Sequence, residues 1–134
     1  MFGLHAFPND PSWTGWWGEE PPFRVPVLVL SHAPRPAVTM ANGTSFEFLS
    51  VTASEALDRV RAAAGSHDVR IGGGTGVVLD FLRAGLVDHL HVSIAPIVLG
   101  RCVRLWDEVM VLESDFAVTS ETAESGTINV TFRR

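Results

Sequence analysis

The sequence contains no lysine, so all ten of its basic residues are arginines. This absence excludes Schiff-base catalysis and a lysine general base. It leaves arginine side chains and backbone N–H groups as the donors for any bound anion. There is also only one cysteine, Cys102, which excludes an intramolecular disulfide. Such low cysteine usage fits a reducing environment, and we expect a cytoplasmic protein.

Charge and long apolar runs are scarce as well. Only 19% of the 134 residues are charged and the net charge is -5, which argues against a nucleic-acid partner because phosphate binding needs clustered cations. The longest apolar run, "VPVLVL", is too short to span a membrane, and the opening "MFGLHAFPND" lacks the pattern of a signal peptide. In contrast, 46% of the residues are hydrophobic, which is enough for the core of one domain.

Hydrophobic periodicity predicts an α/β domain. Residues 1–24, rich in tryptophan and proline, predict a long ordered loop, in which the tryptophans pin the loop or a subunit interface. Apolar runs and alternation predict strands at 24–32, 44–51, 68–71 and 88–100, and a hairpin at 115–134 with Gly126 in its turn. This order favours a sheet that is parallel in its middle and antiparallel at its C-terminal end.

Two helices are expected between these strands. The first begins at Thr52, has Glu55 three residues later as a capping box, and ends at Gly65. The second follows the glycines at 72–76 and ends at Gly85.

The first candidate site is the glycine-rich segment between a strand and the second helix: Gly72, Gly73, Gly74, Thr75 and Gly76. Ligands bind beyond the carboxyl ends of strands in α/β sheets, and a helix N-terminus without side chains in the way suits a pyrophosphate. The spacing matches neither G-x-G-x-x-G nor a P-loop. A tight turn that only needs glycine for its backbone conformation therefore stays open as the alternative.

The second candidate site follows the strand at 24–32, where Ser31, His32 and Arg35 stand close together in the sequence. A hydroxyl and one or two cations at a strand end suit a second phosphate, such as the 2′-phosphate that separates NADP from NAD. The alternative is that Ser31 only shapes a turn and that Arg35 is solvated.

Other polar pairs give weaker indications. His89 and His91 share one face of the strand at 88–100, a spacing that can bind metal, but no third ligand stands at a fixed offset. We therefore expect no metal and interpret the pair as pocket lining or interface. Glu19 and Glu20 are adjacent and would point apart, so they are a poor acid–base pair.

Three consecutive motifs carry a family resemblance. They are Gly72-Gly73 after a strand, "AGLVDHL" at 84–90, and "APIVLG" at 95–100 with Arg104-Leu105-Trp106 after it. Together they resemble the C-terminal half of the dihydrofolate-reductase-like fold, specifically the reductase domain of riboflavin biosynthesis and its stand-alone relatives. The stretch "WWGEEPPFRVPVLVLSHAPR" resembles a subgroup of those relatives, so that the likeness covers residues 13–108.

The resemblance implies one domain over residues 1–134 with three αβα layers, a mostly parallel central sheet and a C-terminal antiparallel hairpin. It implies a homodimeric, NADPH-dependent reductase, similar to 5-amino-6-(5-phosphoribosylamino)uracil reductase or dihydrofolate reductase. Such an enzyme transfers hydride to a C=N or C=O bond of a pteridine- or pyrimidine-like substrate. The glycine-rich segment would hold the NADPH pyrophosphate, and Ser31, His32 and Arg35 would face the 2′-phosphate. His32 stands where many relatives carry arginine, which leaves the preference for NADP over NAD open.

The sequence departs from that family at its beginning. Relatives usually open with a central strand and a segment like "MSLDGFIA" that approaches nicotinamide and substrate, and neither is present here. We expect that this strand is missing and that the natural gene begins upstream of Met1. The family's catalytic candidates would lie there, so no catalytic residue is assigned. Two alternatives stay open: a remnant that binds a nucleotide or a partner chain without catalysis, and a structural module in which the glycines only form a turn.

Overall fold

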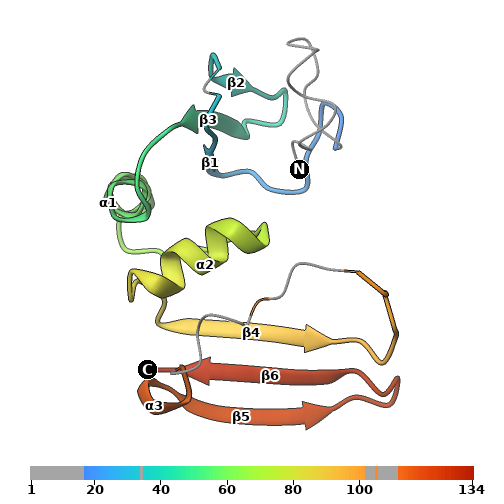
Figure 1. The fold of residues 1–134 in the computed structure, drawn as a ribbon. Helices are drawn as coiled ribbons and strands as arrows, with labels where there is room; N and C mark the ends of the chain where they lie inside the picture. Colours follow the sequence, from blue (N-terminus) through green and yellow to red (C-terminus); the bar gives the residue numbers. More distant parts are fainter. Residues whose placement is uncertain (1–16, 34, 102–104, 106–111) are drawn as a thin grey trace. The chain divides into compact units, whose positions relative to one another are not determined.

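The computed structural model describes residues 17–33, 35–101, 105 and 112–134. The chain divides into two compact units, residues 1–69 and residues 70–134. Each unit contains one three-stranded sheet, and helices follow or precede the strands (Figure 1). The predicted α/β class is therefore confirmed.

The first sheet has the order β1-β3-β2. Strand β1 (Pro26–Leu30) runs parallel to β3 (Ser45–Leu49), and the short β2 (Val38–Thr39) pairs antiparallel with β3. The strands predicted at 24–32 and 44–51 are both present and pair in parallel, but the described strands form two three-stranded sheets instead of the one sheet that was expected.

The core of the first unit is aromatic. Phe46 and Phe48 are 1% and 4% exposed, because alternation along β3 turns both rings to the same face. Met40 is buried with them, and partly buried apolar side chains complete the cluster: Phe23, Val27, Val29 and Val38.

Helix α1 (Ala53–Ala64) begins where the sequence predicts it. The Thr52 hydroxyl accepts a hydrogen bond from the Glu55 N–H, and the Glu55 carboxylate accepts one from the Thr52 N–H at 2.9 Å. The predicted capping box is confirmed, as is the end of the helix at Gly65, whose φ is 61°.

The segment before β1 is tied to the loop after β2. The Asn42 side-chain amide donates to the Pro21 carbonyl, and the buried Thr44 hydroxyl donates to the Phe23 carbonyl. The ring of Trp17 meets that of Phe23 edge to face, with centroids 6.1 Å apart. This ordered end fits the loop predicted for residues 1–24, whereas Trp13 and Trp16 lie outside the described residues.

The second unit begins with an irregular segment and helix α2 (Thr75–Arg83). The prediction of a strand at 68–71 is wrong, because these residues form no ladder with any described strand. A strand exists only where a neighbouring backbone takes up its hydrogen bonds. The helix ends close to Gly85 as predicted, with Ala84 as its C-cap.

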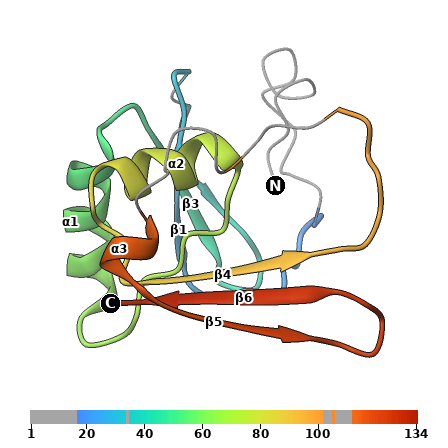
Figure 2. The same cartoon turned by 60° about the horizontal axis from the view of Figure 1, so that its bottom comes forward.

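The second sheet has the order β4-β6-β5 and is antiparallel throughout (Figure 2). It consists of β4 (His89–Ile94), β5 (Ala117–Thr122) and β6 (Ile128–Arg133), with the four-residue α3 (Leu112–Asp115) before β5. The predicted hairpin with Gly126 in its turn is confirmed. The strand predicted over 88–100 stops at Ile94, because Pro96 lacks the N–H that a ladder needs.

The C-terminus is attached to the loop before β4. The Arg134 N–H donates to the Asp88 carbonyl at 3.0 Å, and its guanidinium donates to the Gly85 carbonyl at 2.7 Å. The same guanidinium lies 4.8 Å from the centroid of the buried Phe116 ring.

Among the described residues, the helices are too short or too polar to cross a membrane.

Candidate functional site

The glycine-rich segment forms the entry to helix α2. Gly74 is the N-cap residue, and the first helical hydrogen bond runs from the Val78 N–H to the Gly74 carbonyl at 3.1 Å. Because glycine has no side chain, no cap hydrogen bond satisfies the N–H groups of the first turn. These groups and the positive end of the helix dipole therefore face whatever lies beyond the helix start.

The space beside this segment is open. A Cβ atom built on Gly72, Gly73, Gly74 or Gly76 would meet no atom within 4 Å, and all four residues are exposed. Gly73 has a φ of 98°, a conformation that favours glycine, and the Gly73–Gly74 peptide bond is cis. Because the space beside these four glycines is open, a ligand oxygen can approach their backbone closely.

The charge at the helix start also favours an anion. The first turn of α2 contains no acidic residue, and the Asp80 carboxylate, further along the helix, lies 3.6 Å from the Arg83 guanidinium. The segment thus offers backbone donors without a nearby carboxylate on the same helix turn. Phosphate groups fit such a site.

The second candidate site lies where β1 ends. The Ser31 N–H continues the ladder to the Leu49 carbonyl at 2.9 Å. Its hydroxyl is 3.1 Å from both the N–H and the carbonyl oxygen of Ala33, so it shapes the turn. His32 is exposed beside it. The turn-forming role that the sequence left open for Ser31 is therefore present.

Arg35 is half-buried and packs on the core. Its guanidinium carbon lies 5.1 Å from the centroid of the Phe48 ring, which is a cation–π arrangement. The alternative that Arg35 is fully solvated does not fit this contact with the Phe48 ring.

The two sites belong to different compact units, and the structure describes each within its own. It brings the five residues of the glycine-rich segment together at one helix start. Ser31, His32 and Arg35 follow β1 as predicted, whereas the glycine-rich segment follows no described strand, because residues 68–71 form no ladder.

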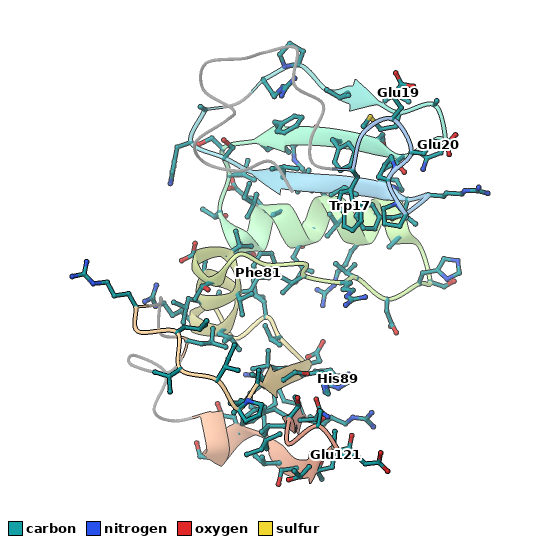
Figure 3. The ribbon with its side chains drawn as sticks, turned by 90° about the vertical axis from the view of Figure 1, so that its right-hand side faces the viewer. Trp17, Glu19, Glu20, Phe81, His89 and Glu121 are labelled. Carbon is teal, nitrogen blue, oxygen red and sulfur yellow. The ribbon has the colours of Figure 1, made fainter. Side chains whose placement is uncertain are left out.

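A polar row crosses the second sheet. His91 Nδ1 is 3.1 Å from the Thr131 hydroxyl, and the Ser93 hydroxyl donates to the side-chain amide oxygen Oδ1 of Asn129 at 2.7 Å. His89, labelled in Figure 3, is on the same face and exposed. The sequence predicted this face of β4 but missed Thr131 and Asn129 as partners. The alternation of Ile128, Val130 and Phe132 along β6 could have indicated them.

The remaining candidates show no catalytic grouping. Glu19 and Glu20 are both exposed, as Figure 3 shows for the labelled side chains. Within the described part of the chain, no three His, Cys, Asp or Glu side chains come together as metal ligands. Cys102 lies outside the described residues.

Comparison with solved structures identifies a similar fold in a pyrimidine reductase-like protein from Corynebacterium diphtheriae, at 19% sequence identity and a TM-score of 0.50. The match covers 81% of this chain and 49% of that chain, so this chain spans about half the length of the solved protein. No curated protein matches the sequence.

A family model gives the more specific result. The model of the RibD C-terminal domain matches residues 6–129, which include both candidate sites and all the described strands except most of β6. The resemblance to the riboflavin-biosynthesis reductase domain is thereby confirmed. The chain belongs to the RibD C-terminal domain family.

Proposed function

We propose that this chain binds NADPH through its glycine-rich segment, Gly72–Gly76, and acts as a reductase related to riboflavin biosynthesis. The observation that carries the proposal is the open, uncapped start of helix α2, where glycine backbone lies beside unobstructed space. Membership of the RibD C-terminal domain family supports it independently.

The residues present fit a dinucleotide at this place. Backbone N–H groups of the first turn of α2 would hold the pyrophosphate, and no acidic residue in that turn repels it. Gly73, with its positive φ, turns the chain into the helix without a side chain that would occupy the ligand's space.

The strand end at Ser31 would recognise the 2′-phosphate that distinguishes NADPH from NADH. Arg35, oriented by Phe48, and the exposed His32 supply the cationic groups, and the Ser31 hydroxyl supplies a further donor. We also propose the dihydrofolate-reductase-like fold with three αβα layers that the family resemblance implies.

The proposed reaction is reduction of a pyrimidine- or pteridine-like ring, and the pyrimidine reductase-like name of the solved relative supports this substrate class. Bound NADPH supplies a hydride to the carbon of a C=N or C=O bond, and the nitrogen or oxygen takes a proton. The described residues would hold and orient this cofactor. We assign no proton donor to them, since no carboxylic acid lies in the first turn of α2.

The proposal is tested by calorimetric titration of the whole chain with NADPH and NADH. Gly73→Ala should abolish saturable binding, because a Cβ at this positive φ both strains the segment and enters the open space. Gly65→Ala is the matched control, since Gly65 also has positive φ and open surroundings but ends α1. It should retain wild-type affinity.

Two further results discriminate the alternatives. Gly72→Ala adds a methyl group without a positive φ, so it should weaken NADPH binding while the unfolding midpoint stays unchanged. If neither cofactor binds the wild-type chain, the glycines serve only as a turn and the proposal is wrong. If NADPH binds but is not oxidised by any pyrimidine or pteridine tested, cofactor binding stands and reduction by this chain does not.

A further inference from the structure

Asn42 and Gly43 form an Asn-Gly pair in the loop between β2 and β3. In such a pair the backbone nitrogen of the glycine can attack the side-chain amide carbon of the asparagine, because glycine has no side chain to obstruct the approach. The reaction, deamidation, needs only water as a co-reactant. The pair is therefore a candidate modification site, and the structure determines when it can react.

The fold holds every group that this reaction uses. The Asn42 amide nitrogen Nδ2, which is the leaving group, donates to the Pro21 carbonyl. The Asn42 oxygen Oδ1 accepts from the Thr44 N–H at 3.0 Å, and the attacking nitrogen of Gly43 donates its proton to the Met40 carbonyl at 3.0 Å. While these hydrogen bonds exist, the Asn42 side chain cannot turn toward the Gly43 nitrogen.

The bonds that hold Asn42 also attach the segment before β1, residues 17–23. Asn42 Nδ2 donates to the Phe23 carbonyl at 3.4 Å as well, and the buried Thr44 hydroxyl donates to the same carbonyl. The ring of Trp17, labelled in Figure 3, meets the Phe23 ring edge to face at the start of this segment. Movement of residues 17–23 away from the loop therefore frees the Asn42 amide.

The remaining hydrogen bond, from the Gly43 N–H, is a weaker barrier. Gly43 is exposed, and a turn hydrogen bond at an exposed residue opens more readily than bonds to a buried group. Thr44, by contrast, is fully buried beneath the segment before β1. Opening of residues 17–23 is thus the step that limits the reaction.

We propose that Asn42 is a deamidation site whose reactivity is controlled by opening of residues 17–23. In the open chain the Gly43 nitrogen loses its proton and bonds to Cγ of Asn42, while the Cγ–Nδ2 bond breaks and Nδ2 leaves as ammonia. Water then opens the resulting succinimide ring at either of its carbonyl carbons, which gives aspartate or isoaspartate at position 42. The net reaction consumes water and releases ammonia.

The product does not fit the closed arrangement. Aspartate at position 42 has a carboxylate oxygen where Asn42 has its NH₂ group, and this oxygen would face the carbonyl oxygens of Pro21 and Phe23. An ionised carboxylate only accepts hydrogen bonds, so the Pro21 carbonyl loses its donor. Isoaspartate also lengthens the main chain in the turn. Deamidation therefore releases the segment, and loss of ammonia makes the release irreversible.

Incubation of the whole chain at mildly alkaline pH, followed by peptide mapping with mass spectrometry, tests the proposal. Asn42 should deamidate about thirtyfold more slowly in the folded chain than in urea, because opening breaks the hydrogen bonds to the Pro21 and Phe23 carbonyls. Asn129 is the internal control. It is followed by Val130, whose branched side chain obstructs attack, so it should react far more slowly than Asn42 in urea.

Thr44→Val tests the control by the segment without altering the Asn-Gly pair. It removes the hydroxyl that donates to the Phe23 carbonyl, so deamidation of the folded chain should be about fivefold faster, with an unchanged rate in urea. Thr122→Val, on the exposed β5, is the matched control and should react at the wild-type rate.

Asn42→Asp reproduces one product and tests the release. Glutamyl endopeptidase should cleave it after Glu19 and Glu20 about tenfold faster than wild type, since cleavage follows the population of the open segment. No modification at Asn42 in urea would overturn the site. Equal rates in folded and unfolded chain, or no acceleration in Thr44→Val, would overturn its control by the segment. Wild-type cleavage of Asn42→Asp would contradict the release.

Discussion

The two sheets of the molecule use the same alternation of apolar and polar residues with different results. In the first sheet the inward side chains of β3 are sealed, with Phe46 1% exposed and Phe48 4% exposed. In the second sheet burial falls along β6, from Phe132 at 7% to Ile128 at 42%. Phe132 is covered by Phe116, whose ring meets it edge to face with centroids 6.3 Å apart.

The difference separates two properties of a strand. Alternation determines which face of a strand is apolar, because successive side chains point to opposite sides. Coverage of that face depends on what else the chain, or another chain, brings to it. The apolar face of the first sheet is covered by its own loop and β2, whereas the second sheet keeps an exposed apolar end at Ile128.

The largest effect should come from the sealed sheet. Phe46→Ala removes a ring that is 1% exposed and should cost about 3–5 kcal/mol of unfolding free energy, measured by urea denaturation. Ile128→Ala, at a side chain 42% exposed, should cost about 1 kcal/mol or less. Equal losses for the two variants would show that the second sheet is as well covered as the first.

An intermediate effect is expected where the first unit holds its N-terminal segment. Thr44→Val preserves shape but removes the buried hydroxyl that donates to the Phe23 carbonyl, and should cost about 1–3 kcal/mol in the same denaturation assay. Thr122→Val, on the exposed β5, is the control and should change stability by about 0.5 kcal/mol at most. If Thr44→Val leaves the unfolding free energy unchanged, the hydrogen bond from Thr44 to the Phe23 carbonyl does not help to stabilise the first sheet.

The smallest effect concerns the exposed capping box of α1. The hydrogen bond from the Thr52 N–H lowers the pKa of Glu55 most, and the hydrogen bond from the Thr52 hydroxyl lowers it further. Because the folded-state pKa is lowered, this stabilisation is present above the unfolded-state pKa and is lost as the pH falls through the folded-state value. Glu55→Gln should flatten this acid-side decrease of the unfolding midpoint. If the variant's unfolding midpoint falls with decreasing pH as in the wild type, the ionised Glu55 carboxylate makes no measurable contribution to stability.

Local signals in the sequence were sufficient for several elements. The Thr52–Glu55 box, the hairpin with Gly126 and the faces of β4 were predicted, because capping, turn chemistry and alternation each act over a few residues. The glycine-rich helix entry was located for the same reason. Its use for a dinucleotide came from the family resemblance and not from the glycines alone.

Features that depend on distant partners were predicted less well. Residues 68–71 are apolar enough for a strand, yet no described strand pairs with them. The two-residue β2 is too short to give a periodic signal. No feature of the sequence indicated that the side chains of Asn42 and Thr44 would donate hydrogen bonds to the carbonyls of Pro21 and Phe23. The stacking of Arg35 on Phe48 likewise depends on where β3 lies relative to the β1 end.

The central claim is that the start of helix α2 binds the phosphates of NADPH, and amide chemical shifts test it most directly. Upon titration of the isotope-labelled chain with NADPH, the amide signals of Gly72, Gly73, Gly74, Thr75 and Gly76 should move to saturation. Those of the hairpin turn at Gly126 should remain unchanged. Saturable shifts elsewhere with no movement in the glycine-rich segment, or no shifts at all, would contradict the claim.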